Sequence, residues 1–266
     1  MYPTPRDAAT VILLRPAATG FEVFLLRRRK NASFMGGAFV FPGGAADPED
    51  GGDLRVTAAR ELFEEAGVLL ASAPVDAATV AALRTRALAG ASMAALLAEA
   101  GLALAPERLT YYAHWITPSA EGKRFSARFY LAVLPAGQHP SFDAQETVDE
   151  AWVTPADALA RAQALALPPP QVRILADLGG AATVDDALAL AAVAAQHPHP
   201  IMPRMAPLAG GGFALLLPWD PAYTTDGTGD SAPMPADHPL AVGPSRFVLE
   251  DRTWKNIAAP TSTTAG

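Results

Sequence analysis

The sequence predicts an α/β fold, in which strands flank helices on both sides along the chain. Three observations predict it: two apolar, strand-forming segments open the chain, helical spacing begins near Asp53, and aromatic and β-branched residues return from Leu109. A chain of 266 residues has room for one elaborated domain or two small ones, and we expect one elaborated domain.

The start of the chain is expected to form a β-hairpin. Ala8 to Arg15 and Phe21 to Arg29 are rich in strand-forming residues, and Pro16 to Gly20 separates them as a turn. A third short strand is expected around Ala38 to Phe41, and it runs directly into Pro42-Gly43-Gly44.

A central helix is expected from about Asp53 to Val68. Apolar residues recur there at helical spacing, and Gly67 stands where a glycine commonly ends a helix. The next stretch, Val75 to Ala103, is rich in alanine and leucine and is interrupted by Gly90, which predicts an insertion of two helices.

The second half of the chain is expected to alternate strands and helices. We expect strands at Leu109 to Thr117, Phe125 to Leu134 and Glu146 to Val153, and helices from Pro155 to about Leu165, Val172 to Leu178 and Val184 to Ala195. The main domain is therefore predicted to span residues 5–195, with its helical insertion at about 75–103.

The proline- and glycine-rich remainder, residues 196–257, is predicted to pack onto this domain as a C-terminal extension. Its apolar islands, Phe213 to Leu217 and Arg246 to Leu249, are too short to form a core of their own. Residues 258–266 are expected to be disordered.

Composition narrows the class of protein. A formal net charge of −7 opposes a nucleic-acid-binding surface, and no apolar run approaches the roughly 20 residues that span a bilayer. The N-terminus lacks the basic and apolar segments of a secretion signal. We therefore expect a soluble cytoplasmic protein without nucleic-acid or membrane partners, and the abundance of alanine, glycine and proline is typical of a GC-rich bacterial genome.

Carboxylates are the candidate metal ligands. The chain has no cysteine, which excludes thiol catalysis and thiolate metal sites, and its five histidines show no metal-ligand spacing. Glu61, Glu64 and Glu65 lie at helical spacing, so their side chains converge on one helix face and repel one another. A divalent cation would make this arrangement favourable. The alternative is an ordinary solvated acidic face.

A glycine turn precedes the acidic helix. Phe41-Pro42-Gly43-Gly44 is expected to expose backbone N–H groups and to let an anion approach closely near the start of the helix. By itself such a triplet is most often only a turn. Together, the turn and the acidic helix indicate a site for a metal ion and an anion.

These residues resemble the nudix box, whose pattern is Gly-x5-Glu-x7-Arg-Glu-U-x-Glu-Glu-x-Gly-U, where U is aliphatic. The second half matches from Arg60 to Val68, but Gly52 stands eight residues before Arg60 where the pattern has glutamate. Gly44 also precedes Arg60 by two residues more than the pattern allows, which indicates a short insertion in Ala45 to Gly52. Three acidic residues remain as alternatives for the missing glutamate: Glu49, Asp50 and Asp53.

The resemblance implies a nudix α/β/α sandwich with a mixed β-sheet, and it implies diphosphate hydrolysis with Mg²⁺ or Mn²⁺. Glu61, Glu64 and Glu65 would bind the metal, and Arg60 would orient these carboxylates. Glu146 stands where family members usually add a further ligand or the general base for the attacking water. Its alternatives are Asp149 and Glu150, and all three also fit ordinary surface charges.

The approach to the glycine turn resembles the signature of the coenzyme A diphosphatases in this family. Arg29, Ser33 and Gly37 fall on matching positions, whereas Arg27 and Lys30 replace a threonine and a serine. The resemblance implies substrate binding by Arg29, Ser33, Gly37, Gly43 and Gly44. The basic run from Arg27 to Lys30 suits an adenosine 3′-phosphate or another extra phosphate, or is simply exposed to solvent.

The longer, peroxisomal-type branch and its bacterial relatives resemble most of the chain. The similar segments are Leu69-Leu70, His114-Trp115-Ile116-Thr117-Pro118, Arg128-Phe129-Tyr130 and Leu167-Pro168-Pro169-Pro170-Gln171. The resemblance implies CoA or acyl-CoA as substrate. The final Thr-Thr-Ala-Gly differs from a peroxisomal targeting signal of the Ser-Lys-Leu type. ADP-ribose, NADH and dinucleoside polyphosphates remain alternatives, as does a catalytically silent binding module. The extension would cover the site or complete a homodimer.

Overall fold

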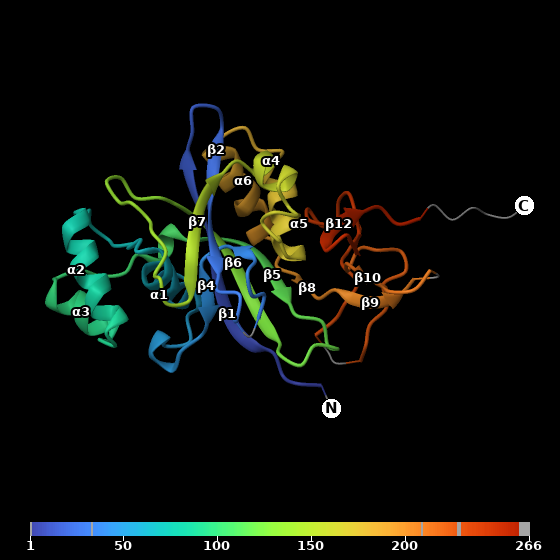
Figure 1. Ribbon diagram of the computed structural model, residues 1–266, viewed down its shortest axis with the longest axis horizontal. Helices are drawn as coiled ribbons and strands as arrows, with labels where there is room; N and C mark the ends of the chain where they lie inside the picture. Colours follow the sequence, from blue (N-terminus) through green and yellow to red (C-terminus); the bar gives the residue numbers. More distant parts are fainter. Residues whose placement is uncertain (1, 33, 209, 228–229, 261–266) are drawn as a thin grey trace, which may run out of the picture.

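Eight strands form one mixed β-sheet in the computed structural model, which describes residues 2–32, 34–208, 210–227 and 230–260 (Figure 1). Its strand order is β3-β2-β1-β6-β5-β8, while β4 pairs with β1 and β7 pairs with β2. The strands are β1 (Arg6–Pro16), β2 (Phe21–Arg28), β3 (Phe39–Val40), β4 (Gly43–Ala45), β5 (Thr110–Ile116), β6 (Phe125–Val133), β7 (Thr147–Val153) and β8 (Pro200–Ile201).

The first strand holds this sheet together. It forms the expected antiparallel hairpin with β2, in which Leu14 lies opposite Val23. Its other edge pairs in parallel with β6, from Arg6 opposite Phe125 onward. Because parallel and antiparallel pairs share one strand, the sheet is mixed, and the α/β prediction is confirmed.

Helices cover both faces of the sheet. Along β1, Val11 and Leu13 pack in the same core as helix α1 (Leu54–Ala66), whereas Ile12 and Leu14 share a core with the helices of the opposite face. Those helices are α4 (Pro155–Ala160), α5 (Pro169–Leu178) and α6 (Val184–Ala195). The alternation follows from the two-residue period of a strand and gives three layers.

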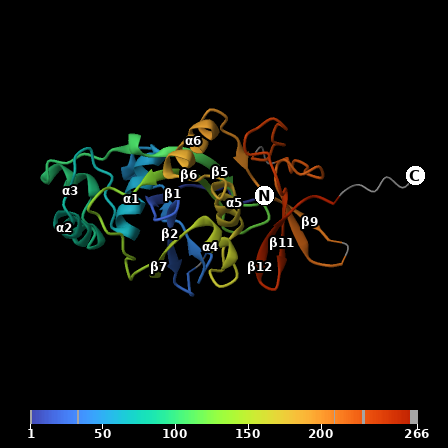
Figure 2. The same cartoon turned by 90° about the horizontal axis from the view of Figure 1, so that it is seen from above.

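The two helices of the insertion are α2 (Ala77–Leu88) and α3 (Met93–Glu99), and Gly90, at φ +93°, lies between them. They form a core of their own with Phe63 of α1 and with Leu69. Figures 1 and 2 place them at one end of the molecule, beyond α1. Within the described ranges, no helix has the length and apolar character needed to cross a bilayer.

Two local expectations are wrong. The sequence predicts a turn at Pro42-Gly43-Gly44, but both glycines lie in strand β4, because a glycine there lets the backbone lie against β1: a Cβ at Gly43 would be 2.4 Å from the carbonyl oxygen of Ala9. Helix α4 ends at Ala160 rather than near Leu165. The chain then continues in turns and passes through a left-handed residue, Ala166, at φ 48°.

The C-terminal extension contains a second sheet that its apolar islands only partly indicated. The sheet is antiparallel, with the order β12-β11-β10-β9. Its strands are β9 (Arg204–Pro207), β10 (Phe213–Leu216), β11 (Arg246–Glu250) and β12 (Thr253–Ile257). The last hairpin turns through Asp251 and Arg252, both at positive φ, without the Asn-Gly or Asp-Gly pair that marks such turns in a sequence.

Arg173 of α5 connects the main domain to this extension. Its guanidinium pairs with Asp177 at 2.9 Å and donates to the carbonyl oxygens of Leu240 and Pro244, at 3.2 and 3.1 Å. It also lies 4.7 Å from the ring centre of Trp219. Phe247 of β11 is fully buried in the core that α5 and α6 share. The extension therefore contributes side chains to the principal core.

Replacing Phe247 with alanine is expected to destabilise the whole chain and not the extension alone. Loss of a buried phenylalanine costs about 3–5 kcal/mol of unfolding free energy. Urea unfolding followed by circular dichroism should show one transition at a lower midpoint. The control is Leu249→Ala, two residues along the same strand and 50% exposed, which should change the free energy by about 0.5 kcal/mol or less. Two separate transitions in the Phe247 variant would contradict a shared core.

Candidate active site

The acidic helix α1 is terminated at both ends as its sequence requires. Asp53 precedes the helix and its carboxylate accepts a hydrogen bond from the N–H of Arg55 at 2.9 Å. Gly67 ends it in the left-handed conformation, at φ 68°. Glu61, Glu64 and Glu65 therefore occupy its last turns, where the helix dipole is negative.

Arg60 collects two of these glutamates. A single guanidinium nitrogen, Nη1, donates to Glu61 Oε1 at 2.9 Å and to Glu64 Oε2 at 3.0 Å. The other two nitrogens, Nε and Nη2, donate to the two oxygens of Asp50 at 2.8 and 3.0 Å. The arginine thus sets the orientation of carboxylates that would otherwise repel one another.

Asp50 is the acidic residue that meets Arg60, among the three alternatives for the missing glutamate. A short 3-10 helix, η1 (Pro48–Asp50), brings it beside α1, where it is 5% exposed and accepts a hydrogen bond from Thr57 Oγ1 at 2.7 Å. Asp53 is occupied in capping α1, and Glu49 is exposed. We therefore infer that Asp50 replaces the upstream glutamate.

The pKa of the Asp50 carboxyl lies below its usual range. Burial acts to raise this pKa, but the hydrogen bonds from Arg60, from the N–H of Asp47 and from Thr57 together outweigh burial. Asp50 is consequently ionised and neutralises part of the Arg60 charge.

Glu65 is turned toward strand β4. It is 5% exposed, and its Oε2 accepts a hydrogen bond of 2.8 Å from the N–H of Gly43. The sequence predicted that this N–H would face an anion, and the structure pairs it with a carboxylate of the chain itself. Burial, reinforced by the neighbouring Glu61, raises the pKa of Glu65 to about 8.

Gly44 makes room for Glu61. A Cβ at this position would lie 2.5 Å from the carboxyl carbon of Glu61, so any larger residue would displace the carboxylate. Burial raises the pKa of Glu61 to about 7, and the charges of Glu64 and Glu146 add to that shift, against the opposing effect of Arg60. The two glycines therefore serve the packing of carboxylates.

Glu146 lies on the loop before β7, close enough to the three helix glutamates for its charge to raise the pKa of each. Its side chain is 67% exposed and lies 3.8 Å from Arg28. The competing candidates make local bonds: Glu150 accepts from the N–H of Phe142, and Asp149 accepts from the N–H of Glu150.

Asp143 holds this loop in place, although the sequence reasoning did not single it out. One oxygen, Oδ1, accepts from the N–H groups of Gln145, Glu146 and Thr147 at 2.8, 3.0 and 2.9 Å. An aspartate often forms a turn by accepting a hydrogen bond from the backbone N–H two residues ahead. The segment Asp-x-x-Glu-Thr could therefore have indicated, from sequence, a turn that positions Glu146. Asp143 thereby sets the position from which Glu146 projects.

The donor chemistry of this site fits Mg²⁺ or Mn²⁺. Four glutamates provide only hard oxygen donors, and the buried ones have raised pKa values that a bound cation would lower. Among the described residues, no three such groups already converge as ligands. Arg60 donates to Glu61 and Glu64, and the N–H of Gly43 donates to Glu65, so an ion bound by all three carboxylates would replace some of these contacts.

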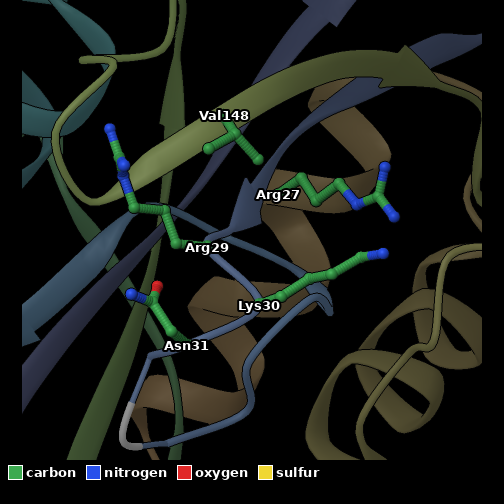
Figure 3. A pocket seen from close by; sticks show the side chains of 5 residues that line it. All are labelled: Arg27, Arg29, Lys30, Asn31 and Val148. Atoms are coloured by element: carbon green, nitrogen blue, oxygen red, sulfur yellow. The ribbon is translucent and has the colours of Figure 1, made fainter.

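The basic residues from Arg27 to Lys30, at the end of β2 and in the turn after it, form a basic turn. This turn lies beside the loop that carries Glu146. A hollow of about 360 Å³ is lined by Arg27, Arg29, Lys30, Asn31 and Val148. Figure 3 shows the side chains of Arg27 and Lys30 extending in the same direction, while Arg29 points away from them. The two neighbouring cations suit a phosphate group.

The sequence predicts substrate binding by Arg29, Ser33 and Gly37, at and after this turn. The contacts of Arg29 and Gly37 are to the backbone of the chain itself. Arg29 donates through Nη2 to the carbonyl oxygen of Ala144, so it ties the turn to the Glu146 loop. Gly37 adopts φ 82° and donates its N–H to the carbonyl oxygen of Arg28 at 3.2 Å. Ser33 lies outside the described residues.

Two family descriptions match the chain. Residues 50–178 match the NUDT19 Nudix domain, and residues 4–85 match the general NUDIX domain. Between them they cover the sheet except β8, the acidic helix, the insertion and the helices α4 and α5. Both include Arg60 and the three helix glutamates.

Known proteins are also similar to this chain. Putative nudix hydrolase 7 of Caenorhabditis elegans is 32% identical over 63% of this chain, and the match spans 58% of the worm protein's length. Acyl-coenzyme A diphosphatase NUDT19 of Gallus gallus is 26% identical over 83% of this chain and 80% of its own. The crystal structure of a NUDIX hydrolase from Alicyclobacillus acidocaldarius superposes with a TM-score of 0.62 and 29% identity, over 70% of this chain and 96% of that one.

Asp50→Asn is expected to destabilise the protein by about 1.5–3 kcal/mol at pH 7, because it removes the carboxylate that accepts two hydrogen bonds of the Arg60 guanidinium and leaves Glu61 and Glu64 as its counter-charges. The pKa of Asp50 is lower in the folded than in the unfolded chain, so its contribution is present above about pH 4 and is lost as the pH falls through the folded value. Urea unfolding measured from pH 7 to pH 3 should show that the difference in unfolding free energy between wild type and variant becomes smaller as the pH falls. A difference that is independent of pH would contradict the ion pair.

Proposed function

The chain belongs to the nudix hydrolase family, and on that premise we propose that it hydrolyses the diphosphate bond of a nucleoside diphosphate derivative, with CoA or acyl-CoA as the substrate. One observation supports this most strongly: Arg60 holds Glu61 and Glu64 together, and Glu146, whose charge raises the pKa of both, lies 3.8 Å from Arg28 at the end of β2. The products would be adenosine 3′,5′-bisphosphate and 4′-phosphopantetheine or its acyl derivative.

In this proposal the glutamates have different roles, which follow from how exposed each side chain is. Glu61, Glu64, Glu65 and Glu146 would hold Mg²⁺ or Mn²⁺, which when bound supplies positive charge for the diphosphate and lowers the pKa of a coordinated water. On the helix, the Glu64 side chain is 32% exposed and that of Glu61 only 14%, so Glu64 has the better access to the reacting groups. Glu146, the most exposed of the four glutamates, would accept a proton from water.

The basic turn supports CoA in particular. CoA differs from simpler ADP derivatives by a 3′-phosphate, and Arg27 and Lys30 present two cations to such a group beside the Glu146 loop. Val148, 43% exposed at the same hollow, adds an apolar surface suited to a nucleoside. The similarity to a protein named acyl-coenzyme A diphosphatase in Gallus gallus agrees with this assignment.

Glu64→Gln is expected to lower metal-dependent hydrolysis at least about 100-fold, because an amide cannot replace a carboxylate as a metal ligand or proton acceptor. The measurement is product release from CoA, acyl-CoA, ADP-ribose, NADH and a dinucleoside polyphosphate with Mg²⁺ or Mn²⁺. Glu99→Gln, at an exposed side chain on the last residue of helix α3, is the matched control and should retain full activity. Cleavage of another panel member instead of CoA would replace the substrate assignment, and a wild type inactive on all five would favour a binding module.

The double variant Arg27→Ala, Lys30→Ala is expected to raise KM for CoA about 10-fold or more while leaving KM for 3′-dephospho-CoA unchanged. A charge-assisted hydrogen bond contributes about 1.5–3 kcal/mol, and only CoA carries the phosphate that would receive it. Arg161→Ala, an exposed arginine after α4, serves as the control. Equal losses on both substrates would contradict a 3′-phosphate subsite.

A further inference from the structure

Helix α1 ends with more negative charge than its own residues balance. Its last turns carry Glu61, Glu64 and Glu65, no basic residue occurs in the last turn, and the terminal carbonyl groups add the negative end of the helix dipole. Arg60 meets the carboxylates, but it does not reach the carbonyl groups. A cation at the end of the helix therefore has to come from another element.

Arg84 of the helical insertion supplies that cation. Its Nε and Nη2 donate to the carbonyl oxygen of Glu64 at 3.1 and 3.0 Å, and Nη2 also donates to that of Glu65 at 2.7 Å. A cation that binds the final carbonyl groups of a helix stabilises both these groups and the dipole. The backbone of two proposed metal ligands is thus held by a side chain from outside the helix.

Gly67 makes this contact possible. A Cβ at this glycine would lie 2.8 Å from Nη1 of Arg84 and 3.1 Å from its Cδ. Together with φ 68°, which side-chain-bearing residues rarely adopt, this close approach explains why the helix ends in glycine. The space left by the missing side chain is filled by the guanidinium.

The same guanidinium also reaches the loop that carries Glu146. Nη1 of Arg84 donates to Ser141 Oγ at 2.9 Å, and the N–H of Ser141 donates to the carbonyl oxygen of Ala66 at 2.9 Å. Two residues farther along, Asp143 holds the backbone of Glu146. Arg84 therefore connects the end of α1 to the Glu146 loop through its hydrogen bond to Ser141 and the short backbone segment from Ser141 to Asp143.

We propose that Arg84 is a positioning residue for the reaction: it fixes the last turn of α1 relative to the Glu146 loop, so that the proposed ligands on the two elements can bind one metal ion. This inference rests on the proposed function. It assigns the α2–α3 insertion a role in the active site, since the packing of the insertion against Phe63 and Leu69 keeps α2, and with it Arg84, beside the helix end.

Calorimetric titration with Mn²⁺ tests the proposal directly and independently of turnover. Arg84→Gln should raise the Mn²⁺ dissociation constant at least about 5-fold and lower kcat for the diphosphate substrate about 10-fold, with KM unchanged. Arg84→Lys, which keeps the charge but not the forked geometry, should recover part of both losses. Arg86→Ala, two residues along the same helix and paired only with exposed Glu99, should match wild type in both.

A second variant guards against simple unfolding. Ser141→Ala removes the hydrogen bond from Arg84 to the loop and leaves the carbonyl contacts of Arg84 in place, so it should weaken Mn²⁺ binding without changing the melting temperature of the metal-free protein by more than about 2 °C. The proposal is overturned if folded Arg84→Gln binds Mn²⁺ within twofold of wild type, or if Arg86→Ala loses as much affinity. A wild type that binds Mn²⁺ but cleaves no diphosphate overturns the proposed function. The role of Arg84 is still decided in that case by the ratio of the Mn²⁺ dissociation constants of Arg84→Gln and wild type.

Discussion

Mutual repulsion among carboxylates at the end of one helix is the constraint on which the rest of this site depends. Glu61, Glu64 and Glu65 share the last turns of α1, and burial makes their ionisation harder. Two arginines, Arg60 and Arg84, place positive charge beside these carboxylates and the end of the helix. Arg60 holds carboxylates from within the helix, and Arg84 holds carbonyl groups from the insertion. Each arginine is itself positioned by the fold, Arg60 by buried Asp50 and Arg84 by the gap at Gly67.

Close backbone approach is the second condition for this arrangement. Strand β4 lies against β1 at a distance that only glycine allows at position 43, and this places the N–H of Gly43 on the Glu65 carboxylate. Gly44 faces Glu61 with no Cβ between them. The glycines that a family pattern marks as a loop are thus, in this chain, a paired strand that fits between β1 and the acidic helix. A hydrogen-bonded strand is more rigid than a free turn, which suits a site where carboxylates must be held apart.

The insertion and the extension lie at opposite ends of the sheet, and they join it in different ways (Figures 1 and 2). The insertion forms a small separate core with Phe63 and reaches the site through polar contacts of Arg84. The extension shares the principal core through Phe247 and is tied to α5 by Arg173. Its contacts with the helix layer account for why short apolar islands, unable to fold alone, form a four-stranded sheet.

The sequence by itself determined the elements with strong periodicity and the spacing of the glutamates in a local motif. Helix α1, the opening hairpin and the glutamates at helical spacing follow from patterns within a few residues, which act without the rest of the fold. Tertiary structure alone decided the features that depend on distant partners. Asp50 was one of three equal alternatives until η1 placed it on Arg60, and β4 became a strand only because β1 offered it an edge. Arg84 lies 20 residues from the Glu64 carbonyl that it binds, and no local pattern records a contact that folding creates between separate elements.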